Sequence, residues 1–280
     1  MNRLLLAVMI LAAAPVLAAD APDPVVLPGV VSTAASEIRL AIRPDGRQML
    51  WGAIGRDAAR GQLDIWERHR TGDGWSAPAP VSFNTDAEDF DPAFARDGRQ
   101  LYFHSARPGG FGGTDIYVVD VDAAGGFGAP RNLGPRINSK GDEWAPTPLA
   151  GGRLLFASDG WGGYGRHDLL LAGPNDAKPR NLGAAINGPQ EDFDGAVSAD
   201  GRTLVFSSGV MSDEEAKVGV FVSRMGARGW APRRPLGVGC SAFVNGLSFD
   251  PADGRRLFYS AACPGGPGRM DLREARLPAG

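Results

Sequence analysis

Five Gly-Arg pairs recur at a nearly regular spacing along this 280-residue chain, and this repetition restricts the fold more than any other feature. The glycines stand at positions 46, 98, 152, 201 and 254, so their spacings are 52, 54, 49 and 53 residues. Repeats of this length are typical of propellers and solenoids, in which each copy is one supersecondary unit. The sequence therefore predicts five structurally equivalent units.

Each unit has the pattern of several short strands. Aspartate precedes the Gly-Arg pair in four copies, which predicts a β-hairpin turn with positive φ at both central residues. An aromatic-rich strand follows, such as Leu101-Tyr102-Phe103, and a fourth strand ends each of the first four copies. A third strand opens with an aspartate that we expect to bond turn backbone, at Asp64, Asp115, Asp168 and Asp271.

The two ends of the chain complete one unit. The fifth copy stops after its third strand, and residues 24–30 resemble a fourth strand, because Leu27 precedes Glu37 by ten residues as Leu133 precedes Glu143. We predict an all-β fold, a single β-propeller of five four-stranded blades closed by pairing of the N-terminal strand with the C-terminal blade. The predicted repeats are 37–88, 89–142, 143–191, 192–243 and 244–280 plus strand 24–30.

Residues 1–18 predict a secretory signal peptide. Arg3 precedes an apolar run from Leu4 to Ala14, and small residues precede a cleavage point after Ala18. Residues 19–280 then form the propeller domain, in the periplasm or outside the cell. No other apolar stretch approaches 18 residues, so no membrane span is expected.

Composition, net charge and cysteine count restrict both the fold and the possible partners. The 40 Gly and 22 Pro residues disfavour long helices, and a net charge of −3 gives no basic surface for nucleic acid. Cys240 and Cys263 are expected to form a disulfide after export, because an up-and-down blade places their two connections on one face. We expect a monomer.

Several segments resemble the WD-like repeats of TolB-type β-propellers. The resemblance is clearest at 89–94, 97–103 and 107–117, continues through Asn132-Leu133-Gly134, and covers nearly all of residues 19–280. It implies an exported bacterial propeller that binds other molecules, often in the cell envelope and without its own catalysis. TolB itself has an additional N-terminal domain and six blades, so a role in the Tol system is not implied.

Acidic residues recur where each innermost strand should begin, at the mouth of the central channel. They are Glu37; Glu88, Asp89 and Asp91; Asp142 and Glu143; and Glu191, Asp192 and Asp194. One interpretation, which we favour because the motif repeats with the fold, is that they cap turns and bind backbone amides. The other is that they attract a basic partner or bind Ca²⁺, with Asp89, Glu143 and Asp192 as the ligands. No other cofactor is expected.

A second use of these acids is glycoside hydrolysis. Some five-bladed propellers hydrolyse glycans with acids at this channel mouth, and Asp91 and Asp194 could serve as acid and base. A catalytic pair usually breaks repeat symmetry, however, since its two members need different environments. His69, His104 and His167 occupy different strand ranks and are not expected to meet, so we expect no zinc site and no His-based triad.

The loops between second and third strands carry the remaining candidate residues. Arg107 and Phe111 lie in the second copy, and Trp161, Tyr164 and Arg166 in the third. Aromatic and Arg residues on loops are typical of protein or glycan recognition, although Trp161 and Tyr164 could instead cover glycine-rich backbone. The leading prediction is non-catalytic binding of a protein or envelope glycan through the channel-mouth face, and the alternative is a secreted glycosidase.

Overall fold

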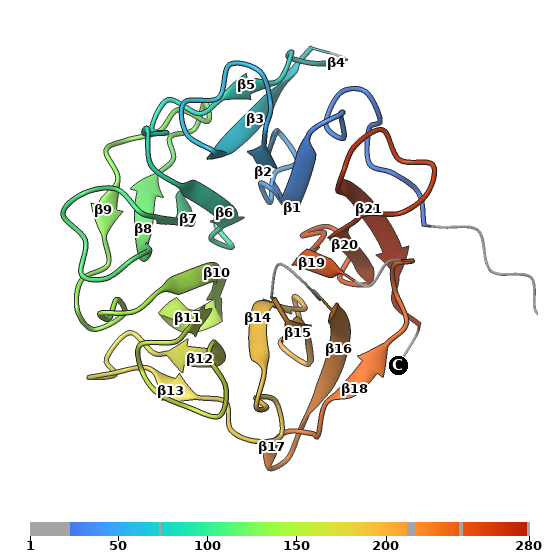
Figure 1. Cartoon of the computed structure of the whole chain (residues 1–280). Coiled ribbons are helices and arrows are strands. Elements are labelled where there is room, and N and C mark those ends of the chain that lie inside the picture. Colours follow the sequence, from blue (N-terminus) through green and yellow to red (C-terminus); the bar gives the residue numbers. More distant parts are fainter. Residues whose placement is uncertain (1–22, 73, 212–216, 241–242, 279–280) are drawn as a thin grey trace, which may run out of the picture.

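A computed structural model describes residues 23–278 apart from residues 73, 212–216 and 241–242. The predicted signal peptide lies outside these residues. The described chain forms five small antiparallel sheets around a common axis, which confirms the predicted five-bladed propeller. Its five inner strands lie nearest the axis (Figure 1). They are β1 (Ser36–Ile42), β6 (Asp89–Phe94), β10 (Glu143–Leu149), β14 (Glu191–Val197) and β19 (Val244–Phe249).

The blades follow the chain in order. Blade 1 contains β1 (Ser36–Ile42), β2 (Gln48–Ile54), β3 (Leu63–Thr71), β4 (Gly74–Trp75) and β5 (Ala79–Pro80). Blade 2 contains β6 (Asp89–Phe94), β7 (Gln100–Ser105), β8 (Asp115–Asp120) and β9 (Arg131–Asn132). Blade 3 contains β10 (Glu143–Leu149), β11 (Arg153–Ser158), β12 (Asp168–Ala172) and β13 (Arg180–Asn181). Blade 4 contains β14 (Glu191–Val197), β15 (Thr203–Val210), β16 (Lys217–Gly226), β17 (Gly229–Trp230) and β18 (Arg234–Leu236). Blade 5 contains β19 (Val244–Phe249), β20 (Arg256–Ala261) and β21 (Asp271–Arg276).

The N-terminal segment closes the ring. The backbone amide of Val26 donates to the carbonyl of Leu272 at 2.8 Å, and the amide of Glu274 donates to the carbonyl of Pro24 at 3.1 Å. In Figure 1 this segment runs beside β21. It covers the edge that blade 5 would otherwise expose, as the sequence predicted.

One aromatic side chain per blade fills the space between adjacent sheets. These side chains occupy equivalent positions on the second strand and have no exposed surface: Trp51, Phe103, Phe156, Phe206 and Tyr259. Burying an aromatic ring of this size stabilises a fold by roughly 2–3 kcal/mol. The repeated aromatic strand of the sequence is therefore the core of each blade.

The predicted hairpin geometry is wrong in one respect. Gly46, Gly98 and Gly201 have positive φ, but the preceding aspartates do not, so only one central residue of each turn is left-handed. The aspartate acts through its side chain instead: the Asp45 carboxylate accepts the Arg47 amide at 2.9 Å, and Asp97 repeats this contact with Arg99 at 3.0 Å. An Asx turn thus replaces the expected backbone type.

The other fold predictions concern the disulfide and the scarcity of helix. Cys240 and Cys263 are bonded, with a Cα–Cα distance of 5.5 Å, which confirms the predicted bridge. The described residues contain one short 3₁₀ segment, Ala150–Gly152. Within them, no helix has the length and apolarity required to cross a membrane.

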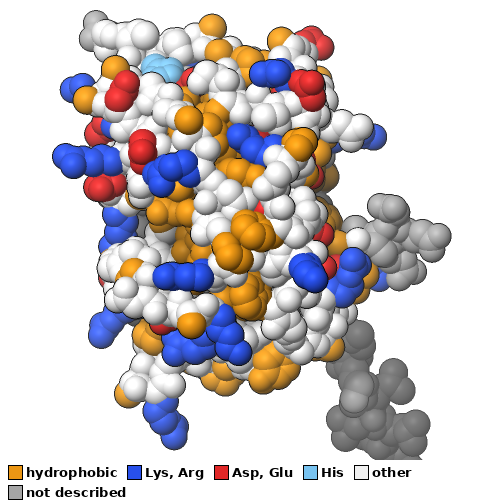
Figure 2. Space-filling model, turned by 90° about the vertical axis from the view of Figure 1, so that its left-hand side faces the viewer, with side chains coloured by type: hydrophobic (Ala, Val, Ile, Leu, Met, Phe, Trp, Pro, Cys, Tyr) orange, Lys and Arg blue, Asp and Glu red, His pale blue; other side chains and the backbone are white. Residues whose placement is uncertain are grey.

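The outer side of the ring carries apolar surface between two blades. Figure 2 faces the side on which blades 2 and 3 lie and shows a band of hydrophobic side chains bordered by Lys and Arg. A groove of about 600 Å³ lies between these blades, lined in part by Tyr102, Leu133, Leu154 and Arg136.

Deleting residues 24–30 should lower the free energy of unfolding by at least about 2 kcal/mol, because backbone hydrogen bonds and the packing of Val26 are lost together. For a chain of this size the melting temperature should fall by roughly 4–8 °C. Scanning calorimetry and size-exclusion chromatography measure the change and any pairing through the uncovered edge. The control lacks residues 19–22, and equal melting of the two chains would disprove closure by this segment.

Candidate functional site

The predicted inner-strand acids close the turns that lead into the inner strands. Each carboxylate is fully buried and accepts a hydrogen bond from the backbone amide four residues earlier. The four acids, with N···O distances of 2.6–3.0 Å, are Glu37, Asp89, Glu143 and Asp192. A buried amide without an acceptor is costly, so these carboxylates support the turn-capping interpretation.

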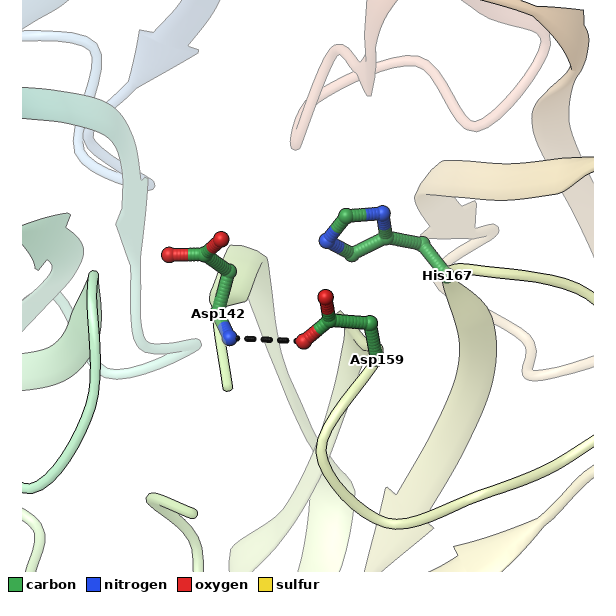
Figure 3. Close-up of side chains that lie close together, drawn as sticks. All are labelled: Asp142, Asp159 and His167. Atoms are coloured by element: carbon green, nitrogen blue, oxygen red, sulfur yellow. Dashed lines mark hydrogen bonds between the residues drawn. The ribbon is translucent and has the colours of Figure 1, made fainter. Parts of the chain in front are cut away.

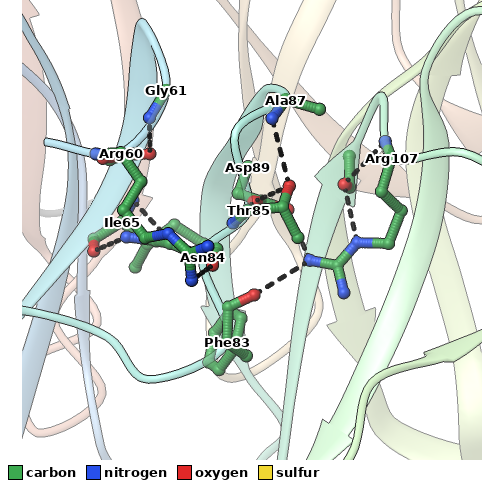
Figure 4. Close-up of polar contacts among 11 residues, drawn as sticks. Arg60, Gly61, Ile65, Phe83, Asn84, Thr85, Ala87, Asp89 and Arg107 are labelled. Atoms are coloured by element: carbon green, nitrogen blue, oxygen red, sulfur yellow. Dashed lines mark hydrogen bonds and ion pairs between the residues drawn. The ribbon is translucent and has the colours of Figure 1, made fainter.

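Each of these acids also has a partner near the end of a second strand or in a later strand connection. Figure 4 shows Asp89 between Thr85, whose amide and hydroxyl donate to it, and Arg107, whose guanidinium lies 2.5 Å away. The Arg107 guanidinium also lies over the rings of Phe103 and Tyr117. Arg107 is thus held inside blade 2 rather than presented to a ligand.

A set of asparagines, which the sequence analysis did not assign, completes this polar framework. The Asn84 side chain accepts from the amide of Ile65 at 3.2 Å and donates to its carbonyl at 2.8 Å (Figure 4). Asn138 and Asn187 repeat the arrangement in blades 2 and 3. Their recurrence at equal distance from each inner strand was the signal available in the sequence.

The structure does not gather the three acids predicted as calcium ligands. Asp89, Glu143 and Asp192 lie in different blades, and none belongs to a group of three metal-ligating side chains found in the described residues. Burial raises the pKa of Glu143 and Asp192, and their hydrogen bonds oppose that rise. Ca²⁺ takes about six to eight oxygen ligands, and each of these carboxylates is engaged by the turn of its own blade, so calcium binding by the three stays a prediction.

A second set of residues lies two positions further along each inner strand, at the propeller axis. Each inner strand has a bulge there, with a residue at positive φ: Arg39, Asp91, Ala145, Asp194 and Gly246. Arg39 crosses the axis to donate to the Thr147 hydroxyl at 2.7 Å, and lies 3.8 Å from Asp194. Asp194 also accepts the Gly246 amide at 2.6 Å.

The two predicted glycosidase acids therefore lie in one buried charged cluster. Burial, followed by the charge of Asp91, raises the pKa of Asp194 to about 7, against the opposing charge of Arg39. Burial lowers the pKa of His104, but its hydrogen bond to Glu88 and the charges of Asp91, Glu88 and Asp194 outweigh burial and raise it. Asp91 and Asp194 are only 6% and 3% exposed.

A cavity of about 290 Å³ opens at the end of the channel where the inner strands finish. One apolar residue at the end of each inner strand lines it: Ile42, Phe94, Leu149, Val197 and Phe249. Arg39 and Thr147 line it at the level of the charged cluster. An apolar molecule or side chain could enter here, whereas Asp91 and Asp194 are not among the lining residues.

The opposite face, at which the inner strands begin, is here called the loop face, and it carries the second-to-third strand connections. Seven large hydrophobic side chains are exposed in the described part of the chain. Five of them lie in or beside these connections: Ile54, Phe111, Tyr164, Val210 and Met211. These side chains come from four blades and share one face, and exposed apolar side chains on a shared face are a candidate binding surface.

The remaining predicted loop residues differ in their accessibility. Phe111 and Tyr164 are 46% and 53% exposed, and the Arg166 side chain is 77% exposed. Trp161 instead donates from its indole nitrogen to the carbonyl of Ile137 at 3.0 Å and packs beside blade 3. The loop face thus offers three of the predicted recognition residues, while Trp161 covers backbone.

The sequence analysis missed one cluster on the loop face. Asp142, Asp159 and His167 bring three ligand atoms within 4.8 Å of one another. The expectation of no zinc site rested on the separation of the three histidines, whereas a single histidine beside two aspartates also offers three ligand atoms. The available signal was that Asp159 and His167 depart from the residues at equivalent positions in the other repeats.

Comparison with known proteins shows the fold. No family model and no curated protein sequence matches the chain. Solved structures that match include TolB from Acinetobacter baumannii, at 14% identity and a TM-score of 0.57, covering 86% of this chain and 54% of TolB. An α-L-arabinofuranosidase from Lactobacillus brevis matches at 13% identity and a TM-score of 0.57, covering 86% of this chain and 91% of the enzyme.

A thermostable family-43 glycoside hydrolase matches at 10% identity and a TM-score of 0.58, covering 90% of this chain and 93% of that chain. At these identities the likeness concerns the fold alone. The predicted resemblance to a TolB-type propeller is confirmed at that level, and the same fold occurs in glycoside hydrolases.

The buried charged cluster predicts a pH dependence of stability. The pKa of Asp194 rises on folding from 3.8 to about 7, so the folded state binds this proton more tightly than the unfolded chain. The free energy of unfolding should therefore fall as pH rises from about 4 to about 7. His104, with a raised pKa, acts in the same direction as pH rises further.

In the Asp194→Asn variant, the difference in melting temperature between pH 5 and pH 8 should be smaller than in the parent. The amide keeps an acceptor for Gly246 but does not titrate, so any uniform loss of stability leaves this difference readable. Asp86→Asn, at an exposed position, should keep the parental difference. An unchanged difference in Asp194→Asn would contradict the assignment.

Proposed function

We propose that this protein is an exported propeller that binds a protein or cell-envelope glycan partner through its loop face, without catalysis. The observation that carries the proposal is the gathering of exposed apolar side chains, with Phe111, Tyr164 and Arg166, on that one face. Aromatic and Arg side chains dominate the energetics of protein interfaces and are common in recognition loops. The framework beneath them is rigid, since its turns are fixed by buried carboxylates.

The chemistry of the loop face also supports binding. A pocket of about 240 Å³ lies there between blades 3 and 4, lined by Arg166, Glu191, Val210 and Met211 among others. It combines one ion pair, between Arg166 and Glu191 at 3.4 Å, with aliphatic walls. Such mixed pockets receive an anchoring side chain or a sugar ring.

The disulfide supports the proposed location. A bond between Cys240 and Cys263 persists in oxidising compartments, such as the periplasm or the extracellular medium. Together with the export signal expected at residues 1–18, it supports a function outside the cytoplasm. We propose a monomer as the binding unit, with no nucleic-acid partner.

A Phe111→Ala/Tyr164→Ala double variant should lose binding of its partner while keeping the parental melting temperature, because both side chains are exposed. Immobilised parent and variant are compared on envelope extract and on a glycan array, with bound material quantified. The control is Met225→Ala, an exposed apolar position at the far end of blade 4. Equal retention of every specifically bound species by the double variant would disprove the loop-face proposal.

Glycoside hydrolysis is a second candidate because one observation favours it. Burial raises the pKa of Asp194 to about 7, and Asp194 lies beside Asp91, so two carboxyl groups are paired here as acid–base hydrolysis of glycosides requires. Against it, both groups are buried, and Arg39 is already the counter-ion of Asp194.

Hydrolysis is tested on an α-L-arabinofuranoside reporter and a panel of envelope glycans. We expect no turnover above that of a buffer blank. Turnover by the parent that disappears in both Asp91→Asn and Asp194→Asn, but persists in Asp86→Asn, would overturn the non-catalytic proposal and establish the glycosidase.

A further inference from the structure

Three potential metal ligands meet on the loop face at blade 3. Asp142 directly precedes β10, Asp159 directly follows β11, and His167 directly precedes β12. Figure 3 shows the His167 imidazole directed toward both carboxylates. One nitrogen and one oxygen from each carboxylate all lie within 4.8 Å of one another.

The imidazole is held in a fixed orientation. Its side chain is 1% exposed, and its Nδ1 lies 2.6 Å from an oxygen of Glu191. The Trp144 indole stacks on it with ring centroids 3.6 Å apart. Because an ionised carboxylate only accepts hydrogen bonds, Nδ1 is the nitrogen that donates to Glu191, which leaves Nε2 as the ring atom available to a metal ion.

Nε2 of His167 has no hydrogen-bond partner in the described residues, although the atom is buried. It faces the carboxylates of Asp142 and Asp159, which are also electron-rich (Figure 3). Oδ1 of Asp142 accepts from Thr114, and Oδ1 of Asp159 accepts the Asp142 amide at 2.8 Å. A divalent cation would satisfy Nε2 and the carboxylates together.

The local charge is suited to such a cation. Three carboxylates, those of Asp142, Asp159 and Glu191, surround His167, and the Arg166 guanidinium lies 3.4 Å from the carboxylate of Glu191. If all three are ionised, this group carries a net charge of −2. A divalent ion would compensate it without any further protein group.

Repeat symmetry shows that the fold does not require this arrangement. The strand registers align Asp159 with Ile54, Ala106 and Gly209, and none of these can bind a metal through its side chain. They align His167 with the residues Leu63, Thr114, Val218 and Met270. Two departures that face each other in one blade indicate a local function added to the repeat.

We propose that Asp142, Asp159 and Nε2 of His167 form a binding site for a divalent transition metal, with Zn²⁺ as the fitting ion. Imidazole with carboxylate ligands suits Zn²⁺, whereas Ca²⁺ takes oxygen ligands. Glu191 is the outer carboxylate that orients the histidine, an arrangement common in zinc sites. Asp159 is exposed, so a coordination position remains open toward the solvent of the loop face.

The test uses the untagged mature chain, stripped with a chelator and dialysed. Isothermal titration with Zn²⁺ should give one ion per chain, and the melting temperature should rise with Zn²⁺ because a ligand of the folded state stabilises it by mass action. Ca²⁺ at millimolar concentration should produce neither effect. Absence of bound Zn²⁺ at about 100 µM free ion, well above the dissociation constants of built zinc sites, would overturn the proposal.

Two variants that each replace an aspartate by asparagine test which residues bind the metal. Asp159→Asn retains an oxygen that can accept the Asp142 amide, so the fold should persist while Zn²⁺ affinity falls at least about tenfold. Asp86→Asn, in the exposed connection from blade 1 to blade 2, should bind Zn²⁺ as the parent does. Equal Zn²⁺ affinity of Asp159→Asn and the parent would overturn the assignment, as would an equal loss in Asp86→Asn.

Discussion

Buried backbone amides in the turns before the inner strands are the constraint on which the rest of this propeller depends. Each turn must reverse the chain in a water-poor space between blades, and the acids Glu37, Asp89, Glu143 and Asp192 supply the acceptor in blades 1 to 4. Asparagine side chains do the same for the third strands. Acids that recur with the repeat therefore hold the fold, and residues that break the repeat are where an added function should be sought.

The fold was predictable because its information is periodic. Glycine spacings near 50 residues, an aromatic second strand and the match of residues 24–30 to a fourth strand together define five blades and their closure. The turn type was not predictable from the Asp-Gly pair alone. The same Asp-Gly pair is compatible with two turns: one with positive φ at Asp45, and one in which the Asp45 side chain accepts the Arg47 amide. The chain adopts the second, and the sequence of the pair does not distinguish them.

The position of the acids was predictable, but their roles were only partly so. Glu143 and Asp142 are neighbours in sequence, yet Glu143 bonds Ser139 in its own turn while Asp142 faces Asp159 and His167. The pairing of Asp159 with His167 joins the two ends of a loop, which no spacing rule reveals. Likewise, Arg39 reaches Asp194 across the axis from a different blade. Such contacts are fixed by ring closure, and the sequence shows them only as departures from the repeat.

The central claim is that the repeated acids are structural and the symmetry-breaking residues of blade 3 form a ligand site. Anomalous diffraction at the zinc edge, from crystals of the mature chain soaked in Zn²⁺, tests both halves in one map. The account predicts a peak bounded by His167 Nε2, Asp142 and Asp159, and no peak at Glu37, Asp89, Glu143 or Asp192. Anomalous density at those repeated acids, or none beside His167, would contradict it.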